Sequence, residues 1–108
     1  MSYRIYYTEQ AESDLRAIYE YIAYTLLVPE TAKKITGRIM TEISSLNEMP
    51  MRYPLYKKEP WKSKGLRNFS VGNYMVFYLP VEDKNAVAVI RIMYGGRNIE
   101  KQLTEAGR

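Results

Sequence analysis

The sequence predicts an α+β fold in which an antiparallel pair of helices packs on a small, mainly antiparallel sheet. Two observations predict it. Apolar residues recur at helical spacing through the first half of the chain, and residues 65–98 contain three segments that are apolar at strand spacing. The order of elements is predicted as β-α-α-β-β-β, and residues 99–105 could add a short terminal helix.

The three C-terminal strands are predicted to form a meander around a central strand. Residues 74–79 are apolar at every position, which a strand tolerates when both faces of the sheet are covered. The pair Gly72-Asn73 is suited to a tight hairpin turn before this strand, and the polar residues 82–85 form a short turn after it. The central strand is therefore expected to pair with residues 66–71 and with residues 86–94.

The first half of the chain predicts a short strand followed by a long helix. Tyr3, Ile5 and Tyr7 alternate with Arg4 and Tyr6, as in a strand, although the sequence does not fix its place in the sheet. The hydroxyl of Thr8 can cap a helix that follows, with acidic residues in its first turn. The stripe that this helix is expected to bury consists of Ala11, Leu15, Ile18, Ile22 and Leu26.

A second helix is predicted to start at Pro29, because proline lacks the N–H that would be unpaired in a first helical turn. The connection between the two helices is short, so they should form an antiparallel hairpin. Gly37 in the second helix costs roughly 1 kcal/mol relative to alanine. The second apolar stripe consists of Ala32, Ile35, Ile39, Ile43 and Leu46.

Composition limits the function classes. A chain of 108 residues with 46% hydrophobic content predicts one domain, spanning residues 1–108. It contains no cysteine and no histidine, so thiol catalysis is excluded and acid-base chemistry must use tyrosine, lysine or carboxylates. We expect no metal, no cofactor, no signal peptide and no membrane contact, and a cytoplasmic location.

Positive charge is concentrated in residues 52–67, hereafter the basic window. It contains six basic residues and one acid, Glu59, for a charge of +5, so the rest of the chain carries −1 of the total of +4. Such a segment attracts phosphates or an acidic protein, although it could also be a solvated loop. The residues expected to bind a nucleic acid or a protein partner are Arg52, Lys57, Lys58, Trp61, Lys62 and Lys64.

The order and spacing of several short segments resemble a known family. The first segment is residues 3–8, followed by Ala11, Asp14-Leu15, Ile18 and Tyr21-Ile22. The others are residues 65–67 with 71–74 and 77–78, and residues 90–92 with Tyr94 and Gly96-Arg97. Together they resemble the RelE/ParE superfamily of bacterial toxins from type II toxin–antitoxin modules. The resemblance covers nearly the whole chain and implies a RelE/ParE-like fold and a growth-inhibiting protein that is kept silent by a cognate antitoxin.

The resemblance implies one of two mechanisms, since fold alone does not choose between them. RelE-like members cut mRNA on the ribosome, and ParE-like members inhibit DNA gyrase without cutting anything. Ribosome-dependent nucleases of the family often carry arginine after the aromatic residue that opens the central strand, and this chain has Met75 after Tyr74. The hairpin of residues 65–78 also resembles ParE-like members more closely, which favours the gyrase inhibitor.

If the chain is RelE-like, the candidate catalytic residues are Arg67, Tyr94 and Arg97. A guanidinium can hold two phosphate oxygens, and a tyrosine can donate a proton to a leaving oxygen. Tyr78 is a second candidate proton donor, and Lys62, Lys64 or Glu59 are candidate bases. Some of these groups and their neighbours also have a structural interpretation: Arg67 can pair with a carboxylate, Arg91 can be a buried cation with a partner, and Tyr74 and Tyr78 can belong to the core. Tyr94 and Arg97 have stronger functional claims, because they lie just past a strand. We expect the cations to converge at one rim of the sheet.

Overall fold

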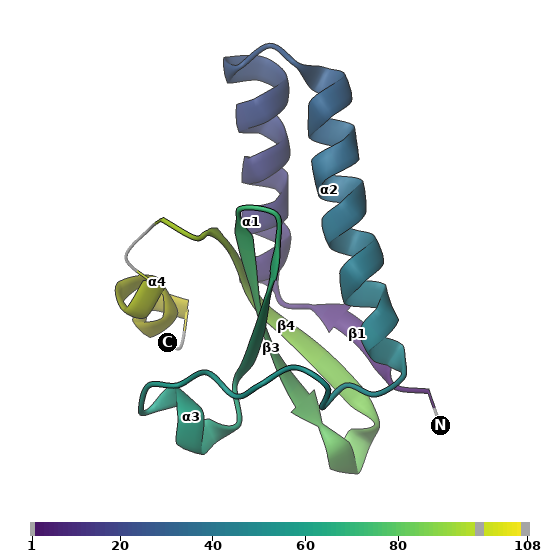
Figure 1. Cartoon of the computed structure of the whole chain (residues 1–108), viewed down its shortest axis with the longest axis vertical. Helices are drawn as coiled ribbons and strands as arrows, with labels where there is room; N and C mark the ends of the chain where they lie inside the picture. Colours follow the sequence, from purple (N-terminus) through teal and green to yellow (C-terminus); the bar gives the residue numbers. More distant parts are fainter. Residues whose placement is uncertain (1, 97–98, 107–108) are drawn as a thin grey trace.

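The computed structural model describes residues 2–96 and 99–106. The chain forms a four-stranded sheet with a long helical hairpin on one face and a loop with two short helices against the other (Figure 1). The strands are β1 (Arg4–Tyr7), β2 (Arg67–Val71), β3 (Tyr74–Val81) and β4 (Ala86–Tyr94). The helices are α1 (Glu9–Glu20), α2 (Pro29–Ser44), α3 (Trp61–Lys64) and α4 (Ile99–Ala106). The predicted α+β class and order of elements are confirmed.

The sheet has the order β1-β4-β3-β2. Strands β2, β3 and β4 form the predicted antiparallel meander, and β1 lies at the edge, parallel to β4. In the turn between β2 and β3 only Gly72 has a positive φ, of 59°, as expected where glycine is the first central residue of a type II′ turn. Asn85 has a φ of 49° and ends the turn before β4.

Both faces of the sheet are covered, as the apolar pattern of β3 predicted. The helical hairpin packs on one face, where Val76 and Tyr78 meet Ile39 and Ile43 of α2. On the other face, Phe77 lies in a smaller cluster with four buried neighbours. These neighbours are Tyr56, Leu66, Met93 and Leu103.

The start of α1 follows the prediction, since Thr8 Oγ1 accepts a hydrogen bond from the Ala11 N–H at 3.1 Å. After α1 the chain continues through a π-helical turn, Tyr21–Thr25, closed by a hydrogen bond from the Leu26 N–H to the Tyr21 carbonyl at 2.9 Å. The expectation that Leu26 is buried is wrong. The wider turn rotates Leu26 off the stripe, and the end of the hairpin projects beyond the sheet (Figure 1).

Helix α2 begins at Pro29, as predicted, and a short 3-10 turn, Ser45–Asn47, continues it. Its stripe is buried except at Ile35, which is half-buried. Residues with positive φ flank this segment: Leu27, with a φ of 62°, precedes it, and Met49, with a φ of 58°, follows it.

Gly37→Ala is expected to raise the free energy of unfolding by about 0.5–1 kcal/mol, because alanine restricts the unfolded chain more than glycine does. A Cβ built on Gly37 meets no atom within 4 Å, so the gain is not offset by a clash. Chemical denaturation of the variant measures the change. The matched control is Gly72→Ala, which should destabilise because Gly72 has a positive φ; equal effects of the two changes would contradict this account.

Candidate functional site

Arg67 is held by backbone carbonyls. It opens β2 and is half-buried. Its Nη1 donates hydrogen bonds to the carbonyl oxygens of Tyr53 and Met51, at 2.6 and 3.2 Å. The structural partner of Arg67 is therefore the loop before it and not a carboxylate, the partner that its structural interpretation proposed. The guanidinium fastens that loop to the edge of the sheet.

Tyr78 belongs to the core, as its structural interpretation predicted. The side chain is fully buried, and its hydroxyl donates to the Pro50 carbonyl at 2.7 Å. Burial raises the pKa of Tyr78 above that of an ordinary tyrosine. Its proton is committed to a backbone acceptor inside the protein, where a substrate does not reach.

Tyr78→Phe is expected to cost about 1–3 kcal/mol of unfolding free energy, because it leaves the buried carbonyl of Pro50 without its donor. Urea denaturation measures this loss. Growth inhibition per molecule of folded protein should not change. A folded variant without toxicity would instead give the hydroxyl a functional role.

Tyr94 lies at the other end of the sheet. It is the last residue of β4, it is 48% exposed, and its ring meets the edge of the Tyr74 ring at a centroid distance of 5.8 Å. Gly96 packs beside it, since a Cβ there would lie 3.0 Å from Cε2 of Tyr94. The hydroxyphenyl group of Tyr94 is therefore exposed to solvent while its ring packs against Tyr74 and Gly96.

The structure does not bring Arg67 and Tyr94 together. Arg67 pairs with Tyr78, whereas Tyr94 pairs with Tyr74. Tyr74 and Tyr78 are four residue steps apart in β3, which corresponds to roughly 13 Å along the strand. Antiparallel pairing thus puts Arg67, at the start of β2, and Tyr94, at the end of β4, at opposite ends of the sheet. Because Tyr94 is not a cation, the expected convergence of the cations at one rim stays a prediction. Arg97 lies outside the described residues.

The basic window wraps the Arg67 end of the sheet and contains α3 (Figure 1). The half-buried ring of Trp61 packs edge to face on Tyr56, with centroids 5.9 Å apart, and so anchors the window. The Arg52 guanidinium lies over the Tyr53 ring, with Cζ 5.1 Å from the ring centroid. The lysines of the window are all exposed, and they are Lys57, Lys58, Lys62 and Lys64.

Two acidic residues, one in this window and one on α4, have structural partners. Glu59 Oε1 accepts from the Ser63 N–H at 2.9 Å, and hydrogen bonds from Ser63 lower the pKa of Glu59, which makes it a weaker base. Glu100 of α4 accepts a hydrogen bond from the Tyr56 hydroxyl. Burial, reinforced by Glu100, raises the pKa of Tyr56 to about 12. Neither pair is set up for proton transfer near neutral pH.

Arg91 is a buried cation with partners on two helices. Its Nε and Nη2 donate to the Asp14 carboxylate of α1 at 2.7 and 2.9 Å, and Nη1 donates to the Gln102 carbonyl of α4 at 2.9 Å. The N–H of Ile92 donates to the same carboxylate at 2.9 Å. The structural interpretation of Arg91 is confirmed. Sequence reasoning missed Asp14 and Gln102; the position of Asp14 beside the apolar stripe of α1 was the available signal.

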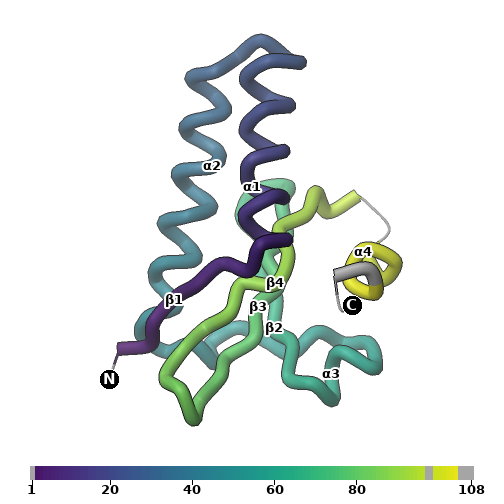
Figure 2. Tube along the Cα trace, turned by 180° about the vertical axis from the view of Figure 1, so that it is seen from behind, coloured from purple at the N-terminus to yellow at the C-terminus, as the bar shows by residue number. Residues whose placement is uncertain are grey.

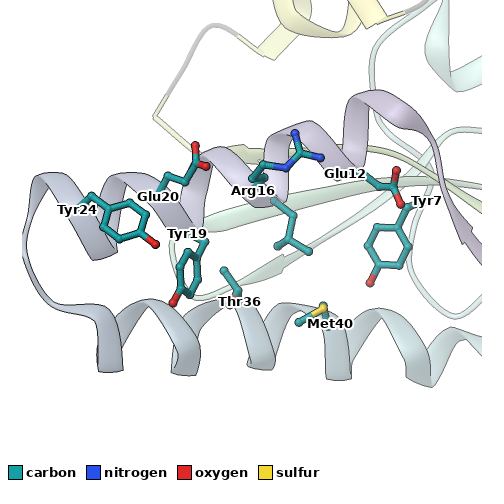
Figure 3. Close-up of a pocket in the computed structure, with 9 residues that line it drawn as sticks. Tyr7, Glu12, Arg16, Tyr19, Glu20, Tyr24, Thr36 and Met40 are labelled. Carbon is teal, nitrogen blue, oxygen red and sulfur yellow. The ribbon is translucent and has the colours of Figure 1, made fainter.

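The helical hairpin has two surface grooves. One lies between α1 and α2, and its lining includes Tyr19, Glu20, Tyr24 and Met40 (Figure 3). The other lies between α1 and the end of β4, and its lining includes Tyr21, Leu26 and Tyr94. Within residues 2–96 and 99–106, no cluster of three or more carboxylates offers a metal site, and no helix is long and apolar enough to cross a membrane.

Comparison with solved structures finds the same fold in RelE and ParE toxins. The toxin–antitoxin system ParDE from P. aeruginosa matches at 23% identity with a TM-score of 0.69, covering 86% of this chain and 96% of that chain. A free variant of E. coli toxin RelE matches at 14% identity and a TM-score of 0.66, covering 98% and 94%. The toxin–antitoxin complex RelBE2 from Mycobacterium tuberculosis matches at 18% identity with a TM-score of 0.60, covering 87% of this chain and 99% of that chain. The fold is therefore that of the RelE/ParE superfamily.

Within the RelE/ParE superfamily, a family model identifies the family to which the chain belongs. Residues 5–99 match the model of the ParE toxin of the type II toxin–antitoxin system parDE, and the chain belongs to that family. No curated protein matches the sequence. The resemblance seen in the sequence is confirmed, and the chain is a type II toxin.

Proposed function

We propose that this toxin stops growth by binding and blocking DNA gyrase, without cutting nucleic acid itself, and that a cognate antitoxin keeps it inactive. The membership of the chain in the ParE toxin family supports the proposal. The solved relatives from P. aeruginosa and M. tuberculosis are toxin–antitoxin systems, which supports the antitoxin partner.

The observation that carries the proposal is the dispersal of the candidate nuclease groups. Metal-free RNA cleavage needs a base, a cation at the phosphate and an acid in one place. Here Arg67 is bonded to loop carbonyls, Tyr78 is inside the core, and Tyr94 is at the opposite end of the sheet from Arg67. A protein that works by binding needs no such assembly.

The test is a supercoiling assay with purified toxin and purified gyrase. Supercoiling is expected to fall as toxin is added and to recover when the antitoxin is present. Full gyrase activity at a large excess of folded toxin would overturn the proposal.

The second candidate is a RelE-like endonuclease that cuts mRNA on the ribosome, with Arg67, Tyr94 and Arg97 and the lysines of the basic window. The observation that favours it is the exposure of Lys57, Lys58, Lys62 and Lys64, which suits contact with rRNA. Primer extension on mRNA from cells that express the toxin would then show cuts at the ribosomal A site. Intact transcripts in arrested cells would exclude this candidate.

We assign the basic window to the antitoxin under the leading proposal, because its charge of +5 suits an acidic protein segment. The affinity of the complex should fall as salt concentration rises. An affinity that does not change with salt would place the antitoxin elsewhere.

A further inference from the structure

The end of the helical hairpin exposes a group of large apolar side chains. We call residues 21–28 the hairpin tip; they comprise the π-helical turn and the connection to α2. Its exposed side chains include Leu27 at 75%, Tyr24 at 69% and Tyr21 at 56%, and Leu26 and Val28 are exposed as well. Clusters of this kind on a small protein mark interaction sites.

Folding alone does not account for the tip. Leu27 combines high exposure with a φ of 62°, a conformation in which leucine is strained and where glycine or asparagine is usual after a helix. The π-helical turn before it is a rare form that is common at functional sites. The chain thus keeps an apolar side chain in solvent at a position that favours a small or polar residue.

The charge around the tip indicates what it binds. Residues 17–32 contain two acids, Glu20 and Glu30, and no lysine or arginine. Lys33 meets Glu30 at 3.9 Å, but both side chains are largely exposed, and such pairs are weak. The tip itself carries no cation for a nucleic acid or an anionic membrane, and the nearest exposed lysines, Lys33 and Lys34, follow it on α2.

The tip and the basic window lie at opposite ends of the molecule (Figures 1 and 2). An acidic antitoxin segment is attracted to the window and not to the tip. A DNA-handling enzyme carries cationic surfaces for its polyanionic substrate, and such a surface complements Glu20 and Glu30. The apolar surface of the tip also continues into the groove between α1 and α2, where Tyr19 and Tyr24 make an edge contact at 6.3 Å (Figure 3).

We propose that the hairpin tip is the surface that docks on the target protein, in an apolar pocket with a cationic rim. This inference rests on the proposed function for the identity of the target, which is gyrase. The tip supplies the apolar anchors, chiefly Tyr24 and Leu27, and the two glutamates on either side of it, Glu20 and Glu30, pair with the cations of the rim.

The test compares Leu27→Asn with Met49→Asn. Met49 is 72% exposed with a φ of 58°, so the two changes have the same chemistry at matched backbone conformations, at opposite ends of α2. Asparagine tolerates a positive φ, so both variants should fold with melting temperatures at or above that of the unchanged protein. Leu27→Asn should raise the toxin concentration for half-inhibition of supercoiling at least about tenfold, as loss of an anchor does. Met49→Asn should leave it unchanged.

Growth arrest after expression of each variant separates the two proposals. If the unchanged toxin arrests growth but does not inhibit gyrase, the gyrase assignment fails, and the tip is still tested by whether Leu27→Asn arrests growth. A folded Leu27→Asn variant with full toxicity overturns the docking proposal. So does Leu27-dependent dimerisation in sedimentation experiments, or Leu27-dependent binding to anionic phospholipid vesicles, since either gives the tip a different occupant. If the unchanged toxin neither inhibits gyrase nor arrests growth, both proposals are contradicted.

Discussion

Asp14→Ala is expected to lower the free energy of unfolding by about 3–5 kcal/mol, because removing one partner of a buried ion pair leaves an uncompensated charge. The carboxylate of Asp14 accepts from Arg91 and from the N–H of Ile92, and the side chains of both charged residues are largely buried. Urea denaturation followed by circular dichroism measures the loss.

Two further variants serve as controls for the Asp14→Ala prediction. Glu30→Ala breaks the exposed pair with Lys33 and should change stability by less than about 1 kcal/mol. Asp14→Ala combined with Arg91→Met should be less harmful than Asp14→Ala alone, because it removes the unpaired charge. Equal losses for Asp14→Ala and Glu30→Ala would show that the buried pair contributes little.

Phe77→Ala is expected to cost about 3–5 kcal/mol, the range for a large aromatic side chain removed from a core. Phe77 is fully buried on the face of the sheet away from the helical hairpin, in contact with Tyr56, whose ring centroid lies 5.5 Å from its own. A large loss measured by thermal or chemical unfolding would establish that this thinly covered face is a second core.

Leu55→Ala is the control for this variant, since Leu55 is the neighbour of Tyr56 in the loop that covers Phe77 but is 39% exposed. It should cost less than about 1 kcal/mol. If Phe77→Ala were as mild as the control, the loop and α4 would not exclude water from this face.

Most of the fold was predictable because its signals are local. The periodic stripes, the Thr8 cap, Pro29 and the Gly72 turn each act within a few residues, and all were found. The position of β1 was not, because its parallel pairing with β4 joins residues about eighty positions apart. The exposure of Leu26 was missed for a related reason, since a π-helical turn changes the period on which the prediction rests.

The site was less predictable than the fold. Residue type identifies a group that can bind phosphate or give up a proton, but not its partners. Arg67 and Tyr78 are both joined to backbone carbonyls of residues 50–53, a loop whose path the sequence does not specify. The exposed lysines were predictable, because charge alone keeps such side chains in water.

The parallel pairing of β1 with β4 has a consequence for how the toxin is made. Residues 4–7 emerge from the ribosome about eighty residues before their partners, residues 86–89. The sheet therefore cannot close during most of synthesis, and the two helices leave the ribosome before the surface that covers them exists. The nascent toxin should stay unfolded, and hence harmless, until β4 has been translated.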